Sequence, residues 1–163
     1  MGSMNTIEEK GQLAYDQAIR WLTRRAYGER ELENRLQQSG FATEAVAQAC
    51  ARCRELGYLD DAAFALSRAR YRLHHGHYGP RRVWAELRAL QVDDEYIQQA
   101  LDFLLAETDS VSLAEAALSK QFGAAVGRVA GEPDQTGRRD AKRRYDFLAR
   151  RGFNDETIWQ VLR

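Results

Sequence analysis

All three histidines of the chain lie within four residues, at His74, His75 and His77. Imidazole binds Zn²⁺ or Ni²⁺, but the segment brings no thiolate or carboxylate ligand with it, and adjacent residues of a helix cannot point at one ion. A histidine at the end of a helix also complements the helix dipole. We therefore expect a helix end and a turn here, with no metal.

Cys50 and Cys53 form a C-x-x-C pair, which occurs in redox centres and zinc sites. A redox pair needs a preceding strand and an exposed thiolate, and a zinc site needs two further ligands at similar spacing. The sequence offers neither. Because the two residues are three apart, between Val46 and Leu56, they fit the apolar face of a helix. We predict that both cysteines are packed in the core.

Asp60 and Asp61 are adjacent carboxylates that could hold a metal for phosphodiester chemistry. Two acids directly before a helix are more typical of helix caps. The sequence contains no nucleophile paired with a base, no glycine-rich phosphate loop and no dinucleotide motif. We predict that the chain is not an enzyme; a metal-dependent enzyme would lose its activity on chelation.

The 163 residues carry 24 basic and 24 acidic side chains, so no overall excess of positive charge indicates a nucleic-acid binder. The charges are nevertheless unevenly distributed. Residues 89–119 contain seven acidic residues and no basic one, whereas residues 138–151 contain seven basic residues and two acidic ones. This asymmetry suits a protein that meets a charged partner on one side.

The first residues, 1–3, resemble an expression remnant before a start at Met4, and no cationic, apolar signal segment follows. No apolar run approaches the roughly 18 residues that a membrane helix needs. Two cysteines suit a reducing compartment. We expect a cytoplasmic protein that makes no membrane contact.

The elements that position these residues are predicted to be helices, because prolines and β-branched residues are few and no alternating strand pattern occurs. The chain also repeats itself. Tyr27-Gly28 recurs as Tyr78-Gly79, 51 residues later. Apolar positions follow the same offset and then recur 61 residues further on: Leu36, Leu87 and Leu148; Phe41, Val92 and Phe153; Val46, Ile97 and Ile158.

The segments FATEAV, VDDEYI and FNDETI place an apolar residue on each side of a helix start, as in the hydrophobic staple. Asp93 and Asn154 are suitable N-caps for their helices. Ala42 is a poor one, so either the first copy is weakly capped or its cap is Thr43.

These patterns predict an all-α fold of three tandem three-helix repeats, at residues 4–57, 58–107 and 108–163. The middle repeat is expected to contain helices at about 61–75, 80–90 and 94–106, and the third a glycine-rich loop at 123–137. Because the helix from Asp61 carries small or apolar residues on two opposite faces, we expect it to be buried on both. We expect the repeats to stack into an elongated, curved rod.

Arginines are concentrated between Arg68 and Arg88, where six of them face a single acid, Glu86. If Val83 and Leu87 are buried, Arg81 and Arg88 lie on the opposite side of their helix. Guanidinium groups suit carboxylates and phosphates equally well, so these residues alone do not name a partner. The predicted partner-binding residues are Arg68, Arg72, Arg81, Arg82, Arg88, Lys142, Arg143 and Arg150.

Three segments resemble the bacterial RecX regulatory proteins: GYLDDAAFA at 57–65, SRARYRLHHGHYGPRRVWAELRALQV at 67–92, and RRYDFLARRGFNDETIWQVL at 143–162. The most specific part is G-Y-L-D-D followed about twenty residues later by Y-G-P-x-R. The resemblance implies a protein that binds the RecA recombinase filament on single-stranded DNA. It also implies that the protein limits growth of this filament and so restrains its strand exchange, ATP hydrolysis and co-protease activity in DNA repair and the SOS response. The resemblance implies neither catalysis by the protein itself nor a cofactor.

Two alternatives stay open at this stage. A direct single-stranded DNA-binding protein would place the same arginines on phosphates, and Tyr78 or Trp84 could stack on bases. A plain helical scaffold would need neither phosphate contacts nor base stacking. We expect a monomer, although repeats exchanged between two chains could form a dimer.

Overall fold

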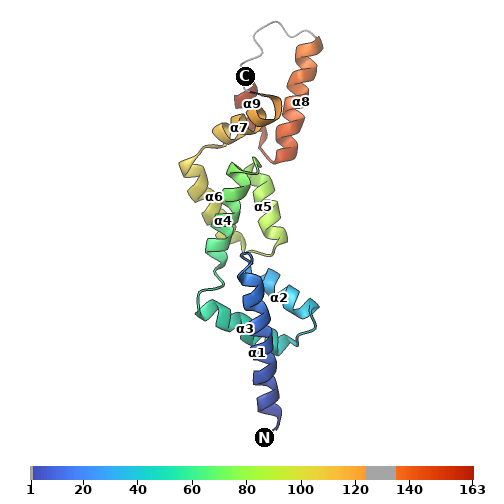
Figure 1. Ribbon diagram of the computed structural model, residues 1–163. Coiled ribbons are helices and arrows are strands. Elements are labelled where there is room, and N and C mark those ends of the chain that lie inside the picture. Colours follow the sequence, from blue (N-terminus) through green and yellow to red (C-terminus); the bar gives the residue numbers. More distant parts are fainter. Residues whose placement is uncertain (1, 124–134) are drawn as a thin grey trace. The chain divides into compact units, whose positions relative to one another are not determined.

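The structure is a computed structural model that describes residues 2–123 and 135–163, and within these ranges it contains nine helices and no strand. The all-α prediction is confirmed. Residues 124–134 of the predicted loop at 123–137 lie outside the described residues, and the prediction is wrong for 135–137, which belong to the helix at Gln135–Arg151. The helices, labelled in Figure 1, are α1 (Gly2–Leu22), α2 (Glu29–Gln38), α3 (Thr43–Glu55), α4 (Asp61–His74), α5 (Pro80–Ala89), α6 (Asp94–Glu107), α7 (Ser110–Phe122), α8 (Gln135–Arg151) and α9 (Asp155–Leu162).

Helix starts follow the capping chemistry of the sequence. The Asn154 side chain accepts a hydrogen bond from the Thr157 amide at 2.8 Å, as predicted for the start of α9. The N-cap of α3 is Ala42, without a side-chain bond, so the alternative of Thr43 as cap is wrong. At all three copies of the turn, the apolar residue at the fourth helical position is buried: Val46, Ile97 and Ile158.

The chain divides into two compact units, and the boundaries between them fall within α4, α5 and α6. The first unit comprises Met1–Ala65 and Arg88–Tyr96. Its core is formed where α1, α2 and α3 pack on one another, around small residues of α1 such as Ala14 and Ala18.

Both cysteines lie in this core, which confirms the prediction of a structural role. Burial raises the pKa of the Cys50 thiol to about 12 and also raises that of Cys53. A thiol that stays protonated at neutral pH is a poor nucleophile and a poor metal ligand.

The two adjacent aspartates cap two different helices. Asp60 accepts a hydrogen bond from the Ala63 amide at 2.9 Å and so caps its own helix, α4. Asp61 instead accepts a bond from the Glu29 amide at 2.8 Å and so caps the start of α2, 32 residues earlier. Burial raises the pKa of Asp61 above its ordinary value. Both carboxylates therefore cap the N-termini of helices.

The second unit comprises Leu66–Leu87 and Ile97–Arg163. Within it α7, α8 and α9 pack around Leu118, Leu148 and Ile158, all with no exposed surface. Ion pairs from Arg68 and Arg72 to Glu86 connect α4 to α5.

The expectation that α4 is buried on two opposite faces holds only in part: Phe64 and Leu73, two and a half turns apart and so on opposite sides of the helix, are both buried. Its buried residues are Phe64, Ala65, Ala69 and Leu73, whereas Tyr71 keeps 58% of its surface exposed and Ala62 is also exposed. Small side chains on a helix do not by themselves indicate burial.

No helix among the described residues has both the length and the apolarity to cross a membrane.

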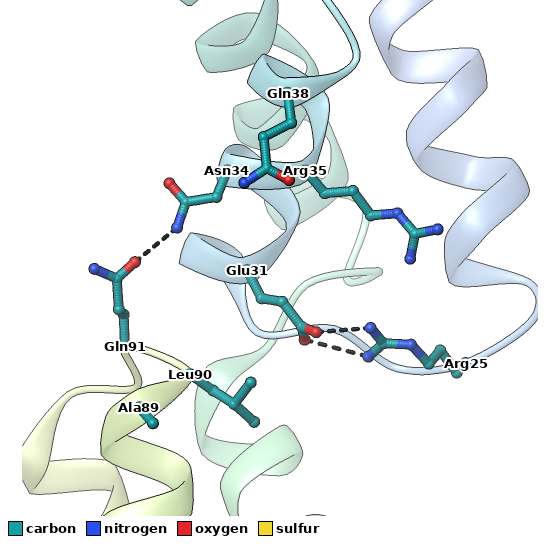
Figure 2. A pocket seen from close by; sticks show the side chains of 8 residues that line it. All are labelled: Arg25, Glu31, Asn34, Arg35, Gln38, Ala89, Leu90 and Gln91. Carbon is teal, nitrogen blue, oxygen red and sulfur yellow. Dashed lines mark hydrogen bonds and ion pairs between the residues drawn. The ribbon is translucent and has the colours of Figure 1, made fainter.

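A left-handed residue ends the second helix of each triplet. Gly40, Gln91 and Gly152, which are related by the offsets of the sequence repeat, have φ values of 92°, 59° and 90°. Glycine adopts this conformation without steric cost, whereas glutamine does not. The Gln91 side chain accepts a hydrogen bond from Asn34 at 2.7 Å, visible in Figure 2.

Replacing Gln91 with glycine should stabilise the protein by about 0.5–1 kcal/mol, because it removes the left-handed strain at the cost of one exposed hydrogen bond. Thermal unfolding of Gln91→Gly measures this change, with Asn34→Ala as the control for the hydrogen bond. Gly40→Ala, which introduces the same strain, should lower stability. A Gln91→Gly variant as destabilised as Gly40→Ala contradicts this account.

Replacing Asp61 with alanine should cost about 1–2 kcal/mol of unfolding free energy, because the Glu29 amide loses its partly buried acceptor. Asp61→Asn keeps an acceptor at this position and should lose less. Denaturant titration of the two variants compares them. Equal stability of Asp61→Ala and the wild type would show that this cap contributes nothing.

Candidate partner-binding surface

The start of α5 lies directly against the end of α8 in the second unit. The Gly79 amide donates a hydrogen bond to the Arg151 carbonyl at 2.7 Å, and the Arg81 amide donates to the Gly152 carbonyl at 3.1 Å. A Cβ atom on Gly79 would lie 2.4 Å from the Gly152 carbonyl carbon. Only glycine permits this backbone approach, which we call the α5–α8 joint.

Arginine side chains surround Tyr78 at this joint. The guanidinium groups of Arg72, Arg82 and Arg151 lie 4.3, 4.5 and 4.7 Å from the centre of its ring. Arg151 also donates to the Gly76 carbonyl at 2.6 Å. Tyr78 is thus engaged by cations of the protein itself.

Two of the predicted partner-binding arginines form ion pairs inside the unit. Arg68 and Arg72 approach the same carboxylate, Glu86, at 2.8 and 2.6 Å. This carboxylate is about one-fifth exposed, so the pairs are partly screened from solvent. The two arginines therefore connect α4 to α5 in the structure.

The remaining predicted arginines of α5 have different surroundings. The exposed Arg82 donates to the Arg150 carbonyl at 3.1 Å and so belongs to the joint. Arg88 lies in the first unit, 3.5 Å from Asp94 in an ion pair that is more than half exposed. Arg81 is exposed. Of these three residues, Arg81 and Arg82 fall in the same unit as the predicted cations of α8.

The predicted cations of α8 are brought together. Lys142, Arg143 and Arg150 line one shallow depression of about 280 Å³, together with Arg139 and Asp146. Sequence reasoning did not single out Arg139, although its position three residues before Lys142 on a helix could have indicated it. Arg144, whose exposure the sequence left open, is half-buried, with its guanidinium 5.9 Å from the centre of the Phe122 ring.

Two mainly apolar pockets accompany these cations. Pro80, Arg81, Trp84 and Leu101 line a pocket of about 270 Å³ between α5 and α6, which we call the α5–α6 pocket. A second pocket, of about 410 Å³ between α8 and α9, is the α8–α9 pocket. Its lining residues are Arg138, Ala141, Lys142, Tyr145, Asp146 and Trp159.

Sequence reasoning missed Trp159, which keeps 52% of its surface exposed. Its ring lies 5.3 Å from that of Tyr145, and the Tyr145 hydroxyl donates to Asp155 at 2.7 Å. In the part of the chain that the structure describes, no three histidine, cysteine, aspartate or glutamate side chains form a potential metal site. This surface presents cations and aromatic rings.

Comparison with known proteins agrees with this arrangement of helices. Residues 14–53 match the first three-helix domain of RecX, and residues 60–101 match the second. A regulatory protein RecX of Legionella pneumophila is 34% identical over 151 residues, covering 92% of this chain and 93% of the relative. The chain belongs to the RecX family.

Two solved RecX structures resemble the fold of this chain over more than nine-tenths of its length. A RecX structure from Lactobacillus salivarius has a TM-score of 0.75 at 16% identity and covers 94% of this chain and 95% of its own. A second regulatory protein RecX has a TM-score of 0.77 at 20% identity and covers 98% of this chain and 74% of its own. At these identities the likeness establishes the fold.

The α5–α8 joint predicts a strong effect of a single methyl group. Gly79→Ala should destabilise the protein by about 1–3 kcal/mol, because the new Cβ overlaps the Gly152 backbone and cannot move aside. Its repeat counterpart is the matched control: a Cβ on Gly28 would meet the Phe64 ring at an ordinary 3.4 Å. Chemical unfolding should therefore show a larger loss of unfolding free energy for Gly79→Ala than for Gly28→Ala. Equal losses would contradict the close backbone contact at the joint.

Proposed function

We propose that this RecX-family chain binds the RecA filament on single-stranded DNA and limits its growth. This binding restrains strand exchange, ATP hydrolysis and co-protease activity in DNA repair and the SOS response. The observation that carries the proposal is family membership, with a curated relative named regulatory protein RecX aligned over nine-tenths of both chains. The protein acts in the cytoplasm as a monomer, without catalysis and without a cofactor.

The exposed cations of the second unit support the location of the binding face. Arg81 on α5 and Lys142, Arg143 and Arg150 on α8 are exposed, and the three on α8 share one depression. Arg68 and Arg72 hold Glu86 in the free protein, so they contribute to this face only if that pairing changes. We therefore assign the main electrostatic contribution to α8 and Arg81.

Direct binding of single-stranded DNA is the second candidate function, favoured by one observation. Four cations, Arg139, Lys142, Arg143 and Arg150, line a single depression and could follow a phosphate backbone. Binding of that kind releases counterions, so its affinity falls steeply with salt and does not need RecA. Affinities for naked and RecA-coated single-stranded DNA at physiological salt distinguish the two functions.

Titration of the protein into RecA that hydrolyses ATP on single-stranded DNA tests the proposal. The wild type should lower the steady-state rate. Arg143→Glu/Arg150→Glu should need at least about tenfold more protein for the same inhibition, since tenfold corresponds to 1.4 kcal/mol of binding energy.

The control is Arg24→Glu, at an arginine of the first unit that is also exposed, which should inhibit like the wild type. Circular dichroism confirms that the variants stay helical. An unaltered ATPase rate with the wild-type protein would refute the proposed function, and full inhibition by the double variant would refute the assigned face.

A further inference from the structure

The two apolar pockets of the second unit occupy equivalent places in two helix triplets. Each lies between the second and third helices of its triplet, α5 and α6 or α8 and α9. The sequence offset of 61 residues relates their linings: Pro80 to Ala141, Arg81 to Lys142, and Trp84 to Tyr145. Each pocket thus has an apolar residue, a cation and an aromatic ring at corresponding positions.

The composition of both pockets suits an apolar side chain beside a negative charge. Trp84 and Leu101 in one pocket, and Tyr145 and Trp159 in the other, supply apolar walls. Exposed cations stand at the edge, Arg81 in the first and Arg138 and Lys142 in the second. A carboxylate next to an inserted apolar side chain would meet these cations.

The first triplet has polar residues at the same positions. The offset of 51 residues relates Pro80, Arg81 and Trp84 to Glu29, Arg30 and Glu33. Arg30 and Glu33 form an ion pair at 2.8 Å, so a carboxylate of the protein already neutralises the cation. The combination of a cation with an aromatic ring therefore distinguishes the second and third triplets from the first.

We propose that the α5–α6 and α8–α9 pockets are paired docking sites for two copies of the same acidic motif. Each copy is an apolar side chain beside a carboxylate, on neighbouring subunits of a protein polymer. Equivalent sites on one chain suit a partner that presents equivalent surfaces at a regular spacing. This inference rests on the proposed function, in which the partner is a filament of identical subunits.

A protein partner fits the pockets better than single-stranded DNA does. The edges of a nucleobase are polar and would lose hydrogen bonds to water against mainly apolar walls. Asp146 lines the α8–α9 pocket, and Asp155 and Glu156 are exposed at the start of α9, where they would repel a phosphate backbone. A peptide with one carboxylate can avoid these acids.

Paired docking predicts a specific pattern of affinities for Arg81→Glu and Lys142→Glu. Two linked contacts strengthen binding by about 10²–10⁴-fold over one contact. Either single variant should therefore lose about a hundredfold or more in affinity for the RecA filament, because one contact no longer forms. On unpolymerised RecA, which presents one motif per subunit, each single variant should bind within a few-fold of the wild type.

Arg30→Glu is the matched control, because it reverses the same charge at the equivalent position of the first triplet. It should bind filament and free subunit like the wild type. Wild-type affinity of both single variants for the filament overturns the inference, and so does an equal loss on filament and free subunit.

The outcomes separate this inference from the proposed function. A wild-type chain that binds no filament refutes the proposed function itself. Filament binding that is unchanged in Arg81→Glu and Lys142→Glu refutes only the paired docking. A loss that is equally large on naked single-stranded DNA identifies a nucleic-acid occupant and also overturns the inference.

Hydroxyl-radical footprinting with mass spectrometry tests occupancy without any substitution. Trp159 is 52% exposed in the free chain and should be protected from oxidation when the filament is bound. Tyr58 of the first unit, 55% exposed, serves as the reference and should be oxidised at its free rate. Oxidation of Trp159 at its free rate in the filament-bound chain would exclude the α8–α9 pocket as a docking site.

Discussion

The close backbone approach of Gly79 and Gly152 is the constraint on which the second unit depends. It brings the start of α5 to the end of α8, two helices separated by about half of the chain, and two backbone hydrogen bonds hold them there. Backbone groups withdrawn from water must find partners, so the joint satisfies the amides that the start of α5 leaves open. Arg82, Tyr78 and Arg151 then pack around this contact.

Arginines of the second unit have two different roles. Arg68 and Arg72 share Glu86, and Arg151 donates to the Gly76 carbonyl, so these side chains connect helices. Those of α8 that line its depression, by contrast, present positive charge to solvent. This division explains how a chain of zero net charge can carry a strongly basic surface on one helix.

Local features of the fold were predictable from the sequence, whereas contacts between distant segments were not. The Asn154 cap depends on residues three apart, and the burial of Cys50 and Cys53 on the period of one helix. By contrast, Asp61 caps a helix that starts 32 residues earlier, and Arg68 pairs with an acid 18 residues later. The place of Trp159 in a pocket became evident only from its contact with Tyr145, which lies on a different helix. Which cations are exposed was therefore decided by tertiary pairing.

The most direct test of the joint is amide hydrogen exchange, followed by NMR, at Gly79 and Arg81. Their amides donate to carbonyls at the end of α8, so they should exchange as slowly as amides inside α8 and only when the unit opens. Exchange at the rate of a solvent-exposed turn would contradict the account, because α5 would then not be held against α8.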